Sequence, residues 1–332
     1  MVSSRRLEPR VAIAMAVHDD ERYLALALDA LCAQRFRDFH LTVWDDGSSD
    51  GSAAVAEGYA GRLPIAVIRG AHRGRHFAKQ AAWSHALPAP YLLVLDSDVA
   101  LPPEALERMA AALDGDPGIA AVSAQARSFT GRPFGAAQAF MEDLFFASNG
   151  DATGNGRWIV GGCVLLRRSA LEGLEVRADV GEDNDLSEKL RARWRIVVPQ
   201  DLVATHYGVP TTLAGVLRRF YRDGVRVRAL LRAYPSARQL GNVARLAPLP
   251  LCLAGMAGAA ALQPWVAAGA GALLAGYAAA FLAASRRVPA RLADRLAGAL
   301  TFTVGNVAFG LGYLREALRG HAAVMREPAR PS

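Results

Sequence analysis

The chain has 332 residues, which is enough for one large domain or two ordinary ones, and 52% of them are hydrophobic. Its three cysteines lie far apart without a Cys-x-x-Cys pair, which argues against a zinc site or a disulfide framework. The formal net charge of +7 indicates an anionic partner such as a nucleotide or an anionic lipid. Nucleic acid is not an expected partner, because no aromatic–basic surface motif accompanies the charge.

The first 210 residues alternate short apolar runs with helical patterns. Apolar runs at 11–17, 41–44, 65–68 and 91–95 predict buried strands, and later runs at 161–167 and 195–198 predict two more. The first run lacks a small-residue cleavage site, so we interpret it as a strand rather than a signal peptide. The alternation predicts an α/β domain over residues 1–210 with a Rossmann-like, mostly parallel sheet.

Carboxylates follow two of the predicted strands. Asp45-Asp46-Gly47-Ser48 follows the second run, and Asp96-Ser97-Asp98 follows the fourth. Ligands of open α/β sheets bind beyond the carboxyl ends of the strands, and paired carboxylates suit a hard divalent cation that bridges phosphates. Asp and Ser are also ordinary turn and cap residues, so the first motif alone has a structural reading as well.

A third acidic group, Glu182-Asp183-Asn184-Asp185, comes about ten residues after the strand that begins with Gly161-Gly162. Acidic residues stabilise the start of a helix. A carboxylate at such a position can also act as a general base that takes the proton from an acceptor hydroxyl in a group-transfer reaction. On a helix, Asp183 and Asp185 are about 200° apart, whereas Glu182 and Asp185 can share a face. Geometry alone therefore leaves the choice of base open.

Together these motifs resemble family 2 glycosyltransferases of the GT-A fold, particularly membrane-anchored members that assemble exopolysaccharides. The resemblance covers roughly residues 10–232 and includes the basic segment 73–80, although His18-Asp19-Asp20 stands where Tyr-Asn is more usual. The resemblance implies that Asp183 is the catalytic base and that the metal is bound by Asp98 and His206. It implies that the donor is bound by Val17, Asp46, Lys79, Asp96 and Ser97. The residues implied on the acceptor side are Gly162, Glu182 and Asp185.

The resemblance also implies a reaction. A sugar moves with inversion from a nucleotide-diphosphate sugar to a lipid-linked or saccharide acceptor, with Mg²⁺ or Mn²⁺ as cofactor, in cell-surface glycan or exopolysaccharide assembly. Residues 218–224 lack the Gln-x-x-Arg-Trp motif of processive relatives, which favours addition of single sugars. Three alternatives are a transferase that acts on polyprenyl phosphate, an inactive GT-A-like membrane scaffold and a nucleotidyltransferase. The sequence has no glycine-rich phosphate loop after the first predicted strand, which argues against a nucleotidyltransferase.

The C-terminal third has a different character. Residues 211–245 combine helical apolar spacing with many arginines, which predicts a basic amphipathic helix on an anionic membrane surface, or alternatively a solvated helix. Residues 246–285 carry no charge and are long enough for two membrane crossings that turn at Gln263-Pro264; the alternative is a buried soluble hairpin. For the apolar segment 296–314 we favour an interfacial or re-entrant position. Arginines flank the hairpin on both sides, so we expect a bacterial inner-membrane protein whose catalytic domain and flanks face the cytoplasm.

Overall fold

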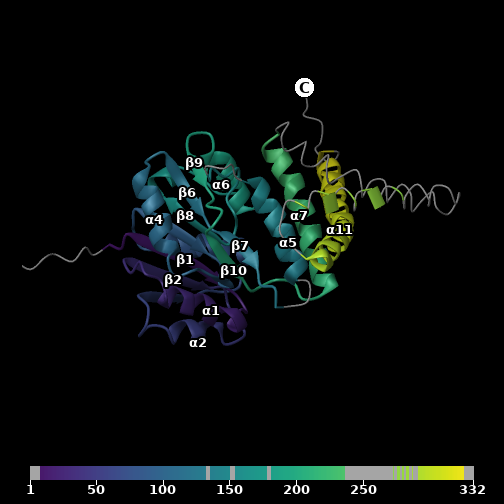
Figure 1. Cartoon of the computed structure of the whole chain (residues 1–332). Helices are drawn as coiled ribbons and strands as arrows, with labels where there is room; N and C mark the ends of the chain where they lie inside the picture. The colour runs from purple at the N-terminus through teal and green to yellow at the C-terminus, as the bar shows by residue number, and fades with distance from the viewer. Residues whose placement is uncertain are drawn as a thin grey trace, which may run out of the picture. The chain divides into compact units, whose positions relative to one another are not determined.

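The computed structural model describes residues 8–131, 135–149, 154–177, 181–235 and 291–324, with a few single residues between 272 and 286 (Figure 1). The predicted hairpin at 246–285 lies almost wholly outside the described residues, so its two crossings stay a prediction. The chain divides into two compact units, one formed by residues 1–129 with 145–209 and the other by residues 130–144 with 210–332.

The first unit contains a seven-stranded mixed sheet in the order β3-β2-β1-β4-β8-β6-β9. Four strands run parallel at one side: β3 (Ile65–Arg69), β2 (Phe39–Asp45), β1 (Val11–Val17) and β4 (Tyr91–Leu95). β8 (Cys163–Arg167) is antiparallel to both β4 and β6 (Ile119–Ser123), and β9 (Arg195–Val197) is parallel to β6. The predicted α/β, mostly parallel sheet is confirmed.

Helices cover both faces of this sheet, and β1 turns large apolar side chains to one face and small ones to the other. On one face, Ile13 and Met15 pack beneath α1 (Glu21–Cys32), α2 (Ser52–Glu57) and α4 (Ala105–Gly115). On the other face, Ala12 and Ala14 pack with α3 (Arg75–His85) and α6 (Glu182–Leu190). The small side chains of β1 on this second face let α3 come close to the sheet.

A three-stranded sheet in the order β5-β10-β7 lies in the same unit. Its strands are β5 (Val99–Ala100), β10 (Val203–His206) and β7 (Gln125–Ser128). The antiparallel register of β10 and β5 pairs His206 with Val99, which places His206 beside the Asp-x-Asp motif. The predicted strand at 161–167 begins two residues later than expected, and Gly162 adopts a positive φ of 94° ahead of β8. A short 3₁₀ turn, Arg168–Leu171, follows β8.

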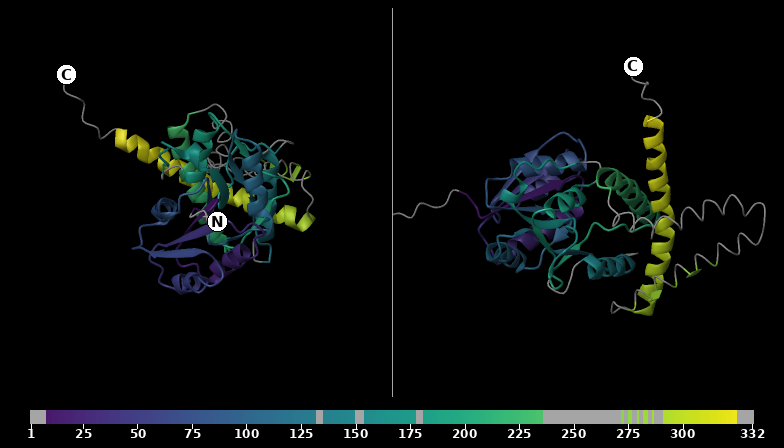
Figure 2. Two further views of the ribbon diagram at one scale, coloured as in Figure 1. Left: turned by 90° about the vertical axis from the view of Figure 1, so that its left-hand side faces the viewer. Right: turned by 90° about the horizontal axis from the view of Figure 1, so that it is seen from above.

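The second unit is helical. It contains α7 (Leu213–Ala233), α11 (Leu292–Val324) and residues 135–144 of α5 (Gly135–Asn149) (Figure 2). The side chain of Thr212 caps α7 by accepting the backbone N–H of Gly215 at 3.1 Å. Within α11, Leu292–Tyr313 is long and apolar enough to cross a membrane, and it is the one such helix in the described part of the chain.

Candidate active site

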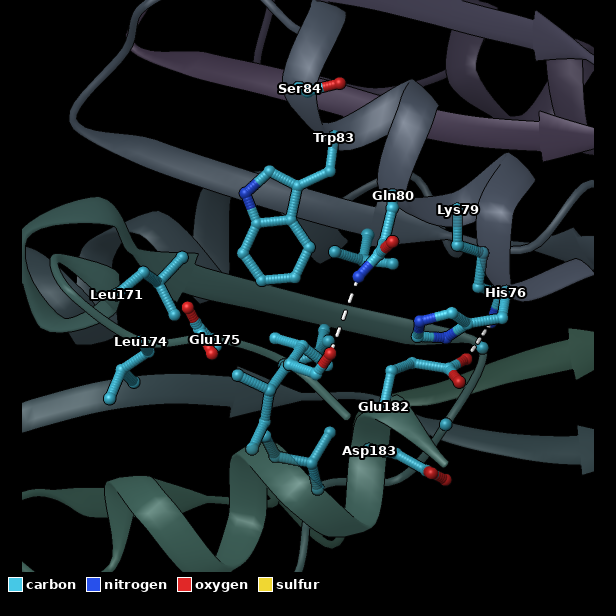
Figure 3. Close-up of a pocket in the computed structure, with 17 residues that line it drawn as sticks. His76, Lys79, Gln80, Trp83, Ser84, Leu171, Leu174, Glu175, Glu182 and Asp183 are labelled. Atoms are coloured by element: carbon cyan, nitrogen blue, oxygen red, sulfur yellow. Dashed lines mark hydrogen bonds and ion pairs between the residues drawn. The ribbon is translucent and has the colours of Figure 1, made fainter. Parts of the chain in front are cut away.

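Lys79, Asp96 and Glu182, which lie far apart in sequence, form one charged cluster. Lys79 Nζ from α3 lies 2.7 Å from Asp96 Oδ1 after β4 and 2.5 Å from Glu182 Oε1 at the start of α6. Arg75 Nη2, one helical turn before Lys79, lies 3.3 Å from Asp96 Oδ2 and 4.0 Å from Glu182 Oε1. Figure 3 shows Lys79 and Glu182 facing each other across the gap between the two helices. The structure therefore joins predicted donor-side and acceptor-side residues.

The cluster keeps its ionised state because its charges compensate one another. Burial raises the pKa of Asp96 and of Glu182, but the opposing effect of Lys79 and Arg75 is larger and leaves both pKa values below their ordinary range. Burial lowers the pKa of Lys79, but Asp96 and Glu182 together raise it above its ordinary value. The two carboxylates and the two cations, Lys79 and Arg75, are thus all charged at neutral pH. The cations can exchange their carboxylate partners for an anionic ligand.

Asp98 and His206 form the predicted metal-side pair. His206 Nε2 lies 3.2 Å from Asp98 Oδ2, and the backbone N–H of Tyr207 donates to the carbonyl of Asp98 at 2.8 Å. The backbone of Gly208 lies directly against the Asp98 carboxylate, so a Cβ at position 208 would collide with it. The carboxylate oxygen of Asp98 is a ligand that suits Mn²⁺ or Mg²⁺ once phosphate oxygens complete the coordination.

The site includes Asp20, which sequence reasoning did not select. Ser97 Oγ donates to Asp20 Oδ2 at 2.6 Å, and the backbone N–H of Asp20 donates to Ser52 Oγ at 2.8 Å. Burial raises the pKa of Asp20 to about 6, and the negative charge of Asp98 adds to the rise. Through these two hydrogen bonds, Asp20 links the loop after β1 to the segments that follow β4 and β2. Its position directly after a predicted strand was the available signal.

Asp46 is held rigidly at the end of β2. Its side chain is buried and accepts the backbone N–H groups of Arg73 and Gly74 at 3.1 and 2.8 Å, while His72 Nδ1 lies 3.0 Å from Oδ2. The His72 ring stacks on that of His18, with centroids 4.0 Å apart. Among the described residues, His18, Asp46 and His72 are the one trio whose potential metal-ligand atoms lie within 4.8 Å of one another.

Two predicted donor residues, Val17 and Ser97, make hydrogen bonds to the acidic loops. The side chain of Val17 is buried in the core, and its carbonyl accepts the backbone N–H of Asp46 at 2.9 Å. Ser97 bonds to Asp20 as described above. Both residues therefore position the acidic loops, and their direct contact with a donor stays a prediction.

A cavity of about 500 Å³ opens beside the charged cluster (Figure 3). Its polar wall includes Lys79, Gly162, Glu182 and Asp183, and much of the remaining wall is apolar. Asp183 Oδ2 lies so close to Gly161 that a Cβ there would be only 2.8 Å away. The two glycines before β8 therefore leave room for both the carboxylate and a ligand. The apolar part of the wall is formed by Trp83, Val94, Ile159, Val164, Leu171, Leu174, Val176 and Leu186.

The structure directs Asp185 away from this cavity. Its side chain is fully buried, accepts the backbone N–H of Arg177 at 3.0 Å and lies 2.7 Å from Lys189 Nζ. Glu182 and Asp185 therefore do not face the cavity together, although their helical spacing allowed it. Of the three predicted acceptor-side residues, Gly162 and Glu182 line the cavity, whereas the geometry gives Asp185 a structural position.

Known proteins share this sequence pattern. Residues 12–174 match the model of glycosyl transferase family 2. The undecaprenyl-phosphate 4-deoxy-4-formamido-L-arabinose transferase of Klebsiella pneumoniae subsp. pneumoniae is 32% identical over 111 residues, which cover 32% of this chain and 34% of that protein. The protein of the same name from Proteus mirabilis is 32% identical over 108 residues, covering 31% and 33%. The chain thus spans about a third of the length of these curated relatives.

The fold has a counterpart among solved structures. The mannosyltransferase PcManGT from Pyrobaculum calidifontis, solved in complex with GDP-Man and Mn²⁺, is 22% identical with a TM-score of 0.66. The alignment covers 93% of this chain and 88% of that one, and it shows a shared fold. From the sequence match and the fold together, residues 12–174 form a family 2 glycosyltransferase domain with the GT-A fold.

Proposed function

We propose that the protein transfers a single sugar, with inversion, from a nucleotide-diphosphate sugar to a hydroxyl of a lipid-linked acceptor at the cytoplasmic face of a bacterial inner membrane. The observation that carries the proposal is the position of Asp183 in the wall of the cavity that the Lys79–Asp96–Glu182 cluster borders. The proposed product belongs to cell-surface glycan or exopolysaccharide assembly.

The nucleotide end of the donor is assigned to the loops after β1 and β2. Asp46 is fixed by two backbone N–H groups, so its remaining acceptor capacity is pre-oriented for the N–H groups of a base. The stacked rings of His18 and His72 lie beside it and offer flat faces to a planar heterocycle. A base bound here would place the ribose and diphosphate toward Asp96 and Asp98. The GDP-Man complex of PcManGT supports a donor of this class.

The diphosphate end is assigned to Asp98, His206 and the two cations of α3. Asp98 and His206 would hold Mg²⁺ or Mn²⁺, and the bound cation would neutralise charge on the departing nucleotide diphosphate. Arg75 and Lys79 sit next to Asp96 and provide further positive charge for the phosphates. The Mn²⁺ in the PcManGT structure supports this choice of cation.

Among the three acids of α6, the surroundings favour Asp183 as the base. Glu182 is paired with Lys79, which lowers its pKa and weakens it as a proton acceptor, and Asp185 is paired with Lys189. Asp183 lines the cavity against Gly161, where an acceptor hydroxyl can approach it. The proton would move from that hydroxyl to the Asp183 carboxylate as the new glycosidic bond forms.

A second candidate acceptor is polyprenyl phosphate, which the printed names of the Klebsiella and Proteus relatives favour. A phosphate monoester has a second pKa near 6, so it is already ionised at neutral pH and needs no protein base. The two acceptors thus differ in their requirement for Asp183.

A product assay with the protein in lipid nanodiscs tests the proposal. A panel of nucleotide sugars is offered with either a lipid-linked saccharide or undecaprenyl phosphate, and lipid products are identified by mass spectrometry. The proposal predicts extension of the lipid-linked saccharide by one sugar. A sugar found only on undecaprenyl phosphate would support the second candidate, and no lipid product with any donor would contradict both.

A further inference from the structure

Two histidines and one buried aspartate meet where β1 and β2 end. His18 directly follows β1, Asp46 directly follows β2, and His72 lies in the segment between β3 and α3. Their potential metal-ligand atoms all lie within 4.8 Å of one another. We call these three residues the histidine–aspartate trio. The trio shares no residue with the Asp98–His206 pair.

His72 and Asp46 already have the spacing of two ligands on one ion. His72 Nδ1 lies 3.0 Å from Asp46 Oδ2. Zinc binds histidine nitrogen at about 2.0–2.1 Å and carboxylate oxygen at about 2.0–2.2 Å, so two such atoms on one zinc ion are about 3.0–3.5 Å apart. An ion can therefore bind both atoms without a shift of either backbone.

The third ligand requires a ring to turn. The rings of His18 and His72 are stacked, with their centroids 4.0 Å and their planes 23° apart, so their in-plane nitrogen lone pairs do not meet at one point. The His18 side chain is 38% exposed, and the χ2 angle of histidine varies over a broad range. Its ligand nitrogen has to move by no more than about 2 Å to reach the spacing of ligands on one ion.

The backbone around the trio is held in place. In the loop after β1, the Asp19 carboxylate accepts the backbone N–H of Ser49 at 2.7 Å, which ties this loop to the one after β2. A Cβ at Gly47 would lie only 2.7 Å from the backbone nitrogen of His72, so the loop after β2 also packs directly against the segment that carries His72. Because the loops are fixed, binding of an ion needs side-chain rotation but no ordering of backbone.

Two imidazoles and one carboxylate select the kind of ion. Mg²⁺ prefers an octahedron of oxygen ligands, whereas Zn²⁺ binds nitrogen and oxygen, commonly with three protein ligands and one water. The trio therefore suits Zn²⁺ and discriminates against Mg²⁺. It contains no cysteine, so the lack of a Cys-x-x-Cys pair in the sequence does not bear on it.

We propose that His18, Asp46 and His72 form a zinc-selective cation site, and that a Zn²⁺ ion bound there excludes the nucleotide base of the donor. The exclusion rests on the proposed function, which assigns this place to the base. The Asp46 side chain is only 1% exposed, so its free surface is too small to contact both an ion and a base. Rotation of His18 toward the ion also opens the ring stack beside which the base would lie. Zinc should therefore inhibit the enzyme at this site.

Calorimetry on the untagged full-length protein in detergent tests the site directly. All samples carry Asp98→Ala and contain excess Mg²⁺, so that zinc on the Asp98–His206 pair does not contribute. We expect at least ~10-fold weaker zinc affinity in both His18→Gln and His72→Gln, because loss of a residue that only supports a ligand already costs about 10–100-fold. His85→Gln, which removes an exposed histidine of α3 outside the trio, is the matched control and should bind zinc like the parent.

Unchanged zinc affinity in either His18→Gln or His72→Gln would overturn the three-ligand site. Displacement of zinc by the excess Mg²⁺ would overturn its selectivity.

The exclusion of the base is tested by initial rates with intact Asp98 and with Mg²⁺ in excess over the donor. Zn²⁺ should raise the KM for the donor and leave kcat unchanged, and His72→Gln should lose this response to Zn²⁺. Inhibition at a constant donor KM would overturn the exclusion. If no nucleotide sugar is used at all, the proposed function fails, whereas the calorimetric comparison still decides whether the zinc site exists.

Discussion

The start of α6 presents two adjacent acids with different partners, Glu182 paired with Lys79 and Asp183 at the cavity wall. We expect Asp183→Asn to lower turnover at least ~10²-fold on a hydroxyl acceptor, because a positioned base is lost. Donor affinity, measured by calorimetry, should change little. Glu182→Gln is the matched comparison and should disturb donor binding through Lys79. Normal turnover in Asp183→Asn together with loss in Glu182→Gln would reverse the assignment.

Gly208 supports the metal-side pair through the close approach of its backbone to Asp98. A methyl group in Gly208→Ala has to displace the Asp98 carboxylate, so we expect the Mn²⁺ concentration for half-maximal activity to rise about 10–100-fold. Gly115→Ala is a suitable control, because no atom lies within 4 Å of a Cβ there. An unchanged Mn²⁺ requirement in Gly208→Ala would contradict this supporting role of Gly208.

Asp20 gives the catalytic domain a pH-dependent stability. Its folded pKa of about 6 exceeds the ordinary value of 3.8, so the fold favours the protonated carboxyl. Stability should therefore fall as pH rises from about 4 through 6, by at most ~3 kcal/mol before solvent screening. Asp20→Asn should raise the melting temperature in EDTA at pH 7.5 and have little effect at pH 4.5. Equal shifts at both pH values would contradict this origin.

The sequence predicts those acids of the site that directly follow an apolar run or begin a helical pattern. Asp46, Asp96 and Asp98 follow apolar runs, and the structure brings all three to the same edge of the sheet. Asp20 and Gly208 were missed because their roles arise from contacts with Ser97 and Asp98, which are distant in sequence. The burial of Asp185 beside Lys189 likewise depends on tertiary packing.

Helix α3 shows how the basic residues of segment 73–80 act, which the sequence does not specify. Residues 73–80 were recognised as a basic segment, but the helix that begins at Arg75 was not predicted. Arg75 and Lys79 are four residues apart on that helix and therefore reach Asp96 from one face. Their joint role could not follow from composition, because it requires both the helix and its approach to β1.

The α7–α11 contact predicts a local sensitivity to small side chains. Gly224→Ala places a methyl group against the Phe309 carbonyl, and the overpacking should cost about 1–3 kcal/mol. We expect a lower melting temperature for this helical layer in detergent, followed by differential scanning fluorimetry. Gly276→Ala, where a Cβ meets no atom within 4 Å, should leave the melting temperature unchanged. Equal melting of both variants would contradict close packing at Gly224.

At the scale of the whole molecule, the change of composition near residue 210 coincides with the passage from the sheet-containing unit to the helical unit. The composition did not reveal that residues 130–144 group with the helical unit, because that grouping depends on tertiary contacts. The two crossings at 246–285 and the cytoplasmic orientation of their flanks remain predictions from charge and length.

The proposed reaction needs the GT-A fold, the Asp98–His206 pair and a lipid-linked acceptor at the same time. The most direct measurement is the release of nucleotide diphosphate by the nanodisc-embedded protein, with donor, Mn²⁺ and a lipid-linked saccharide each omitted in turn. We expect rapid release only when all three are present, and loss of that release in Asp98→Ala. Equal release in the presence of EDTA, or full activity of Asp98→Ala, would contradict it.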